Sequence, residues 1–205
     1  MKLYLSPGAC SFAPHIVLNE LGLPFTPVKV DLRSHKLADG TDFYSISPNG
    51  YVPILELDDG MRLSEAQVIL QYLADRKPGT LAPAAGSFER YRLIEALNFI
   101  ATELHKGFGP LWYPDTPEAT KASTLAKLGK RFDRTTQMLG DRQFLVGETF
   151  TIADAYLFTI LSWAGFLKVD LTPWPVLQRY LERIGARPSV QAAKRTESTE
   201  AAATA

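Results

Sequence analysis

The distribution of strand-like and helical runs along the 205 residues limits the possible folds more than any other feature of the sequence. From residue 1 to about residue 77, short extended runs alternate with helical stretches and turn signals. From residue 88 onward there are long helical patterns and no strand signal of any strength. A sheet is therefore expected only from the first part of the chain, and the remainder must bury its apolar faces helix against helix.

The first part predicts an α/β layer in the order strand, helix, strand, then strand, strand, helix. The runs are "KLYL", residues 11–21, "FTPVKVD", "YVPILEL", "MRL" and residues 64–75. The first helix is long enough for a parallel crossover, and Asp58-Asp59-Gly60 predicts a hairpin. Ser64 is the expected cap of the last helix. Residues 33–50 are turn-rich, and we expect this segment to be mobile.

The predicted fold class is thus α/β plus all-α. We expect a sheet domain over residues 1–77, a linker over 78–87 and an all-helical domain over 88–195, with a frayed, low-complexity tail over 196–205. Helical patterns cover about 88–106, 117–139, 152–163 and 175–184. Thr151 and Asp154 have the spacing of a capping box, and Phe150 is placed to add a hydrophobic staple.

Charge and composition exclude several kinds of function. Twenty-two basic and 22 acidic residues give a formal net charge of zero, so no nucleic-acid partner is expected. No apolar run approaches the roughly 20 residues that cross a bilayer, and the N-terminus lacks a signal-peptide core, so we expect a cytoplasmic protein without a membrane partner. One cysteine and three histidines have no metal-ligand spacing, so no metal is expected.

The single cysteine, Cys10, lies in "SPGACSFAP", between the first strand and the first helix. A cysteine is often an inert buried side chain. This position, however, places the sulfur at the predicted N-terminus of a helix, where backbone N–H groups and the helix dipole favour a thiolate. We therefore favour a functional thiol.

Five segments together resemble the glutathione S-transferases, and in particular the bacterial beta class. They are "SPGACSFAPHIVLNE", "NGYVPILELDDG", "LSEA" followed by "QYLAD", "ERYRLIEALNFIATELHKGF" and "FTIADAYLFT". The pairing of Cys10 with "ELHKG" is specific to that class. The resemblance implies a thioredoxin-like first domain (βαβ-ββα), glutathione as cosubstrate and a homodimer.

The resemblance also implies roles for residues of the first domain. Cys10 would lie beside the glutathione sulfur. Pro53 would be a cis-proline that exposes the backbone of Val52 to the cysteinyl backbone of glutathione. Ser64 and Glu65, with the helix N-terminus at Ala66, would bind the γ-glutamyl end, where an anion is favoured.

In the second domain, the resemblance implies that His105 faces the thiol site. Asn98 lies seven residues earlier, close to two helical turns, and is expected on the same face. Asn98, Thr102 and Glu103 would reach the glutamyl end, partly across the dimer interface. A histidine without the resemblance is more often a partly exposed helix residue.

This sequence departs from the family at two positions. His35 stands where lysine usually holds the glycyl carboxylate, and a histidine, with a reference pKa of about 6.5, is mostly uncharged at neutral pH. Lys36 is the alternative. Leu5 removes a tyrosine that many relatives have. His15, inside the first helix, we interpret as structural.

The helical domain also offers an aromatic cluster, which is interpreted either as helical core or as the wall of an apolar pocket; we favour the pocket. Its members are Phe108, Trp112, Tyr113, Trp163 and Phe166.

The predicted function is attack of glutathione thiolate on an apolar electrophile, for conjugation or dehalogenation in detoxification. One alternative is a glutaredoxin-like monothiol reductase using Cys10. Another is a non-catalytic ligand-binding or interaction protein. The identity of the electrophile is not encoded in any motif.

Overall fold

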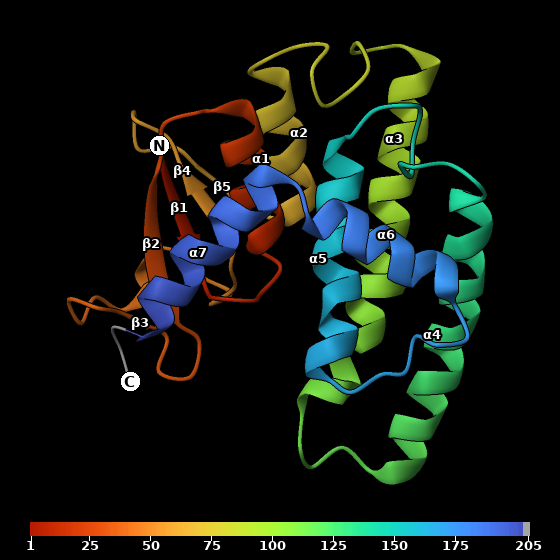
Figure 1. Cartoon of the computed structure of the whole chain (residues 1–205). Coiled ribbons are helices and arrows are strands. Elements are labelled where there is room, and N and C mark those ends of the chain that lie inside the picture. The colour runs from red at the N-terminus through yellow and green to blue at the C-terminus, as the bar shows by residue number, and fades with distance from the viewer. Residues whose placement is uncertain (203–205) are drawn as a thin grey trace. The chain divides into compact units, whose positions relative to one another are not determined.

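The structure, a computed structural model, describes residues 1–202, and side chains for residues 1–198. The chain divides into two compact units (Figure 1). The first unit comprises Met1–Thr80 together with the chain from Ala186 onward, and the helical unit comprises Leu81–Gly185. Within the described residues, every strand lies in the first unit. The predicted fold class, an α/β part and an all-helical part, is confirmed.

The first unit contains a five-stranded mixed sheet in the order β3-β2-β1-β4-β5. Its strands are β1 (Lys2–Leu5), β2 (Thr26–Asp31), β3 (Lys36–Leu37), β4 (Ile54–Glu56) and β5 (Arg62–Leu63). β1 and β2 are parallel, and the other neighbours are antiparallel. Helix α1 (Phe12–Leu21) forms the predicted crossover, and α2 (Ala66–Asp75) packs beside it.

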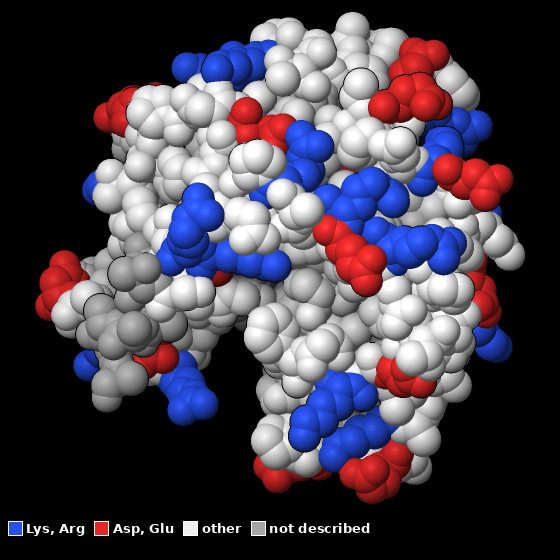
Figure 2. Space-filling view, viewed as in Figure 1, with Lys and Arg blue, Asp and Glu red and all other residues white. Residues whose placement is uncertain are grey.

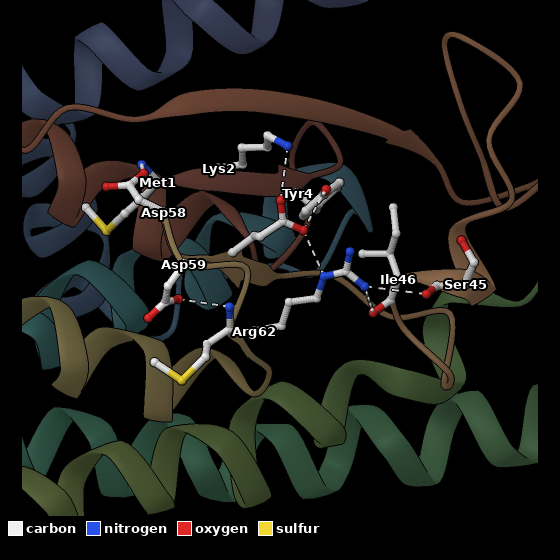
Figure 3. Close-up of polar contacts among 10 residues, drawn as sticks. Met1, Lys2, Tyr4, Ser45, Ile46, Asp58, Asp59 and Arg62 are labelled. Carbon is white, nitrogen blue, oxygen red and sulfur yellow. Dashed lines mark hydrogen bonds and ion pairs between the residues drawn. The ribbon is translucent and has the colours of Figure 1, made fainter.

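The hairpin between β4 and β5 forms as the Asp-Asp-Gly turn predicts. Gly60 adopts φ +85°, a conformation in which glycine has no steric penalty. The Leu57 carbonyl accepts the Gly60 N–H at 3.0 Å, and the Met61 carbonyl accepts the Leu57 N–H at 2.8 Å. Asp59 Oδ1 also accepts the Met61 N–H (Figure 3). The turn is therefore fixed by local chemistry that is visible in the sequence.

The turn-rich residues 33–50 contain β3 and a short 3₁₀ turn, η1 (Phe43–Ser45). β3 pairs with β2 through Val30 and Leu37, a register that depends on the tertiary fold. Ser64 does not cap α2: the N-cap position belongs to Glu65, which makes no side-chain capping hydrogen bond.

The carboxylate of Glu56 and its partners join β1, β4 and β5 to the loop that contains η1. Glu56 accepts hydrogen bonds from Lys2 Nζ at 3.0 Å, Tyr4 OH at 3.2 Å and Arg62 Nε at 2.8 Å. Arg62 also donates to the carbonyls of Ser45 and Ile46 (Figure 3). Hydrogen bonds from Lys2 and then Arg62 lower the pKa of Glu56. The network fixes where the segment after η1 enters β4.

The helical unit contains α3 (Phe88–Phe99), a π-helical turn η2 (Ile100–His105), a 3₁₀ segment η3 (Lys106–Trp112), α4 (Glu118–Leu139), α5 (Ile152–Phe166) and α6 (Pro175–Gly185). α5 contacts α3, η2 and α6, and its residues 152–161 are all buried. Apart from Asp154 and Thr159, these ten residues are apolar, as expected for a helix that is buried on all sides. α5 is thus the centre of this unit's core.

The capping box of α5 is confirmed. Asp154 is fully buried and accepts from Thr151 N–H and Thr151 Oγ1, both at 2.9 Å. The same carboxylate accepts from Leu145 N–H at 2.7 Å and Tyr180 OH at 2.9 Å. Burial raises the pKa of Asp154, and these hydrogen bonds oppose that rise. One carboxylate therefore joins α5 to α6 and to the loop before α5.

The C-terminal segment differs from the expectation in two ways. Residues 188–202 form helix α7 (Pro188–Ala202), so residues 196–202 are helical, where we expected a frayed tail; residues 203–205 lie outside the described residues. From Ala186 the chain belongs to the first unit, where α7 packs on α1, and it does not extend the helical unit to residue 195 (Figure 1). The buried Val190 and Ala193 explain this attachment, since both are apolar and fully covered.

Lys and Arg side chains are interspersed with Asp and Glu over the face drawn in Figure 2. This mixing agrees with the equal numbers of basic and acidic residues. Within residues 1–202, no helix combines the length and the apolar character that a membrane span requires.

Candidate active site

Four strand ends of the first unit meet at one end of its sheet. β1 and β2 are parallel, so their carboxyl ends lie together; β1 is antiparallel to β4, and β4 to β5. The loop after β1, the segment after β2, the residues before β4 and those after β5 therefore lie at the same sheet end. These four segments carry Cys10, His35, Val52 and Glu65. The topology thus gathers the predicted first-domain residues at a single sheet end.

Cys10 and Val52 are in direct contact at this sheet end. The Cys10 Sγ lies 3.2 Å from the Val52 carbonyl oxygen and donates to it. The Val52–Pro53 peptide bond is cis, as the resemblance implies. Val52 precedes the first residue of β4 that pairs in the sheet, Ile54. Its backbone lies beside the thiol at a point where an extended peptide can add to the strand end.

The environment of Cys10 differs from the one that the sequence predicts. α1 begins at Phe12, and Cys10 lies in the turn before it, with its side chain partly buried. The Sγ contacts the Val52 carbonyl oxygen at 3.2 Å. Cys10 therefore lies beside the strand end, in the turn that precedes the helix and not within the first turn of the helix itself.

Glu65 and Ala66 form the start of α2 at the same sheet end. Glu65 adopts φ +65°, where residues other than glycine are uncommon, and its side chain is exposed. Its carbonyl accepts the N–H groups of Val68 and Ile69, both at 3.0 Å. Ala66 is buried and begins the helix, so the first-turn N–H groups of a ten-residue helix face this end. Such a terminus favours a carboxylate ligand.

His35 lies between Tyr44 and the loop that leads to Val52. Its ring is 4.7 Å from that of Tyr44, and its Nδ1 is buried without a hydrogen-bond partner among the described residues. A Cβ at Gly50 would lie 2.9 Å from that Nδ1, so only glycine fits beside the ring. His35 has φ +51°. Lys36 is exposed and pairs in β3. The structure therefore places an imidazole nitrogen beside Gly50, which precedes Val52 by two residues.

In the helical unit, His105 is partly buried between aromatic side chains. Its Nδ1 lies 2.7 Å from Tyr156 OH, and its ring packs edge-on against Trp163 at 5.0 Å. Burial, and to a smaller extent the charge of Lys106, lowers the pKa of His105 to about 4. His105 is therefore neutral at neutral pH. It cannot act as a fixed positive charge, although its neutral ring can still donate one hydrogen bond.

The predicted glutamyl-binding residues lie on the same helical stretch as His105. Asn98 and Thr102 are exposed, and Thr102 Oγ1 donates to the Asn98 carbonyl at 3.0 Å. Glu103 forms a 2.5 Å ion pair with Arg131 of α4. The π-helical turn between Asn98 and His105 has more residues per turn than an α-helix, so seven residues no longer return to one face. The α-helical count therefore no longer supports a common face for Asn98 and His105.

The aromatic cluster divides into core and surface. Phe108 is fully buried and Trp163 almost so, and their rings are 5.9 Å apart. Trp112 packs edge-on against Trp163 at 5.2 Å, with 44% of its surface exposed. Tyr113 and Phe166 are exposed. Phe108 and Trp163 therefore belong to the core, and only the outer members have the exposure that contact with a ligand needs.

Sequence reasoning missed two residues of these environments. Tyr156, the partner of His105, lies in a helix that we explained by its capping box, and no motif marks it. Gly50, which gives space to His35, lies in a turn where glycine has an ordinary conformational explanation. Neither contact can be predicted without the tertiary fold. Within residues 1–202, no group of three or more His, Cys, Asp or Glu side chains is arranged to hold a metal ion.

Comparison with known families matches the two parts of the chain separately. Residues 8–76 match the glutathione S-transferase N-terminal domain, and residues 99–188 match the glutathione S-transferase C-terminal domain. The fold, a thioredoxin-like unit followed by an all-helical unit, is that of a two-domain glutathione transferase. The chain belongs to the glutathione S-transferase family, and it is an enzyme of that family.

Within the family, the chain is similar to bacterial members. Glutathione S-transferase GstA of Escherichia coli O157:H7 is 48% identical over 199 residues, which cover 96% of this chain and 98% of that protein. A sphingomonad glutathione S-transferase solved in complex with glutathione is 43% identical, with a TM-score of 0.93 and coverage of 97% and 99%. A beta-class glutathione S-transferase of Sphingomonas chungbukensis is 44% identical, with a TM-score of 0.92 and coverage of 96% and 98%. The resemblance to the bacterial beta class is confirmed.

Proposed function

We propose that this enzyme binds glutathione along the end of β4 beside Cys10 and transfers the glutathione thiolate to small apolar electrophiles, as a detoxification reaction. The observation that carries the proposal is the 3.2 Å contact between the Cys10 Sγ and the Val52 carbonyl. It puts a thiol beside the backbone on which an extended peptide can pair. The similar sphingomonad enzyme, solved with glutathione, supports this choice of ligand.

The three parts of the tripeptide find complementary groups at the sheet end. The cysteinyl backbone pairs with Val52. The γ-glutamyl carboxylate lies at the N-terminus of α2, where Ala66 begins the helix, and its ammonium faces the exposed carboxylate of Glu65. The glycyl carboxylate is held by the imidazole of His35, which lies beside Tyr44 and Gly50 at this sheet end. Lys36 is the alternative partner.

The chemistry is nucleophilic displacement or addition. The glutathione thiol gives its proton to solvent, the sulfur lone pair forms a bond to the electrophilic carbon, and a halide, where present, leaves with the electrons of its bond. Because His105 is neutral, its role is to donate a hydrogen bond to the thiolate; it is not a charge that stabilises it. The apolar electrophile contacts the outer aromatic residues of the helical unit, Trp112 and Tyr113.

We further propose that the enzyme is a cytoplasmic homodimer in which Asn98, Thr102 and Glu103 reach the glutamyl end, partly from the partner subunit. Large apolar side chains exposed in both units support an association surface; they are Tyr51, Met61, Val68, Phe88 and Tyr91. A two-fold interface is the usual closure for such chains. Sedimentation should give a dimer at micromolar concentration, and a monomer there would contradict this part of the proposal.

The second candidate is a monothiol–disulfide reductase, which the partly exposed thiol of Cys10 favours. Glutathione would then resolve a mixed disulfide on Cys10. One assay panel separates the candidates: glutathione with an aryl chloride, an epoxide and a mixed disulfide, on the wild type and on Cys10→Ala. Thioether formation supports the transferase. Turnover of the mixed disulfide alone, lost in Cys10→Ala, supports the reductase, and no turnover at all supports a non-catalytic carrier.

A further inference from the structure

A buried carboxylate from the C-terminal helix contacts two segments that flank Cys10. Glu197, on α7, has an exposed side-chain fraction of 5%. Its Oε1 lies 2.9 Å from Nδ1 of His15, whose side chain is 1% exposed. Its Oε2 accepts the backbone N–H of Gly8 at 3.0 Å. These three residues all belong to the first unit.

The two partners of Glu197 hold the Cys10 loop from both sides. Gly8 lies two residues before Cys10, in the loop between β1 and α1, and has φ +73°. His15 lies in α1, five residues after Cys10, with its ring packed edge-on against Phe12 and Phe25. The carboxylate therefore joins the start of the loop to the helix that follows it.

General packing of α7 does not explain this carboxylate. α7 is already held to α1 by buried Val190 and Ala193, and by a separate polar contact in which Arg187 and Ser189 donate to Glu20. Burying a carboxylate is unfavourable unless its oxygens are well hydrogen-bonded, and an apolar side chain often replaces such a group without loss of stability. What Glu197 provides, and an apolar residue cannot, is an acceptor for the Gly8 N–H.

We infer that Glu197 is a positioning residue for the active-site loop: its carboxylate, oriented by His15, fixes Gly8 and thereby the placement of the Cys10 thiol. The inference rests on the proposed role of the Cys10 loop in glutathione chemistry. A charge-assisted hydrogen bond to a backbone N–H is stronger and more directional than a neutral one. The C-terminal helix is thus part of the support of the site, although it contributes no group to the reaction.

Three variants test this positioning role. Glu197→Ala removes both hydrogen bonds, whereas the amide of Glu197→Gln can accept from Gly8 and donate to Nδ1 of a neutral His15. Glu20→Ala is the matched control, because it also breaks a contact between α1 and α7 but touches no residue of the loop. In E197A, kcat/KM for thioether formation should fall about 10-fold or more, because small misplacements of reacting groups are costly. E197Q should recover most of this loss, and E20A should resemble the wild type.

Two further readouts do not depend on the enzymatic activity. The rate at which iodoacetamide alkylates Cys10 should rise several-fold in E197A and remain unchanged in E20A. In the wild type, amide exchange measured by NMR should show the Gly8 N–H protected. If E197A and E20A give equal activity and equal alkylation rates, Glu197 is only a packing residue and the inference is wrong. If E197A does not fold, the other measurements still test the inference. Rapid amide exchange of Gly8 in the wild type would overturn it, and so would complete inactivation of E197Q. If the wild type has no transferase activity, the proposed function fails while alkylation and exchange still decide this inference.

Discussion

The thiol of Cys10 donates to the carbonyl of Val52, the residue that precedes a cis-proline, across 3.2 Å. The two residues are 42 positions apart in the sequence and meet because β1 and β4 are antiparallel neighbours. A thiol held in this way is available for exchange with a disulfide whose peptide backbone lies along Val52. This contact leads to the first prediction.

Cys10 should form a stable mixed disulfide with oxidised glutathione. Its sulfur attacks one sulfur of the disulfide and releases one molecule of reduced glutathione, and the sequence has no second cysteine to resolve the product. Intact-mass measurement should show one glutathionyl adduct on the wild type and none on Cys10→Ser. If C10S keeps full conjugating activity but loses reduction of disulfides, Cys10 serves only the redox reaction. If it keeps both activities, the functional interpretation of this thiol is wrong.

His105 should make the free energy of unfolding depend on pH. Its pKa is about 4 in the folded protein and 6.5 as a model value, so between these values the unfolded chain binds a proton that the folded chain does not. The free energy of unfolding should therefore fall as pH falls through this window, by about 3 kcal/mol in total, and this contribution should stop changing below about pH 4.

Denaturant unfolding of the wild type and of His105→Gln checks this pH dependence. H105Q loses the contact with Tyr156 at every pH, so the informative quantity is the difference in slope between the two proteins. That difference should be confined to the window between the two pKa values. Parallel curves would show that His105 titrates alike in the folded and unfolded chains.

Asp154→Ala should destabilise the helical unit far more than an ordinary loss of a cap. The change removes the acceptor of four hydrogen bonds, all donated by the buried residues Leu145, Thr151 and Tyr180. We expect a loss of about 3 to 5 kcal/mol in the free energy of unfolding. Asp170→Ala is the control: Asp170 is exposed and accepts from Thr172, so its loss should cost less than about 1 kcal/mol. Equal losses in the two variants would contradict the role given to Asp154.

His35 should contribute to the affinity for glutathione, because its imidazole lies at the same sheet end as Val52 and can donate a hydrogen bond to the glycyl carboxylate. Titration calorimetry at neutral pH should show a several-fold lower affinity in His35→Ala and a nearly unchanged affinity in Lys36→Ala. The opposite order would assign the glycyl carboxylate to Lys36.

Local chemistry made part of this structure predictable. The Asp-Asp-Gly hairpin and the capping box of Thr151 and Asp154 are complete within a few residues, and the sequence predicts both correctly. The alternation of strands and helices likewise predicts the sheet unit and the helical unit. For the site, the resemblance gathers Cys10 and Val52 correctly, because the family motifs cover the loops at one sheet end.

Other features depend on contacts that no local pattern encodes. β3 is only two residues long and exists through its register with β2. The π-helical turn before His105 alters the face that an α-helical count predicts. Helix α7 packs on α1, and residues that meet there, such as His15 and Glu197, are 182 positions apart. Burial in the folded chain, which the sequence does not reveal, sets the protonation of His105.

The most direct test of the central claim, that glutathione binds along Val52 with its sulfur beside Cys10, is the rate of Cys10 alkylation by iodoacetamide in the presence of S-methylglutathione. This thioether cannot exchange with the thiol, so it occupies the site without reacting. Alkylation should slow in a saturable manner, with a midpoint equal to the dissociation constant measured by calorimetry on the same protein. If S-methylglutathione binds by calorimetry and Cys10 is alkylated at an unchanged rate, glutathione does not lie at this sheet end.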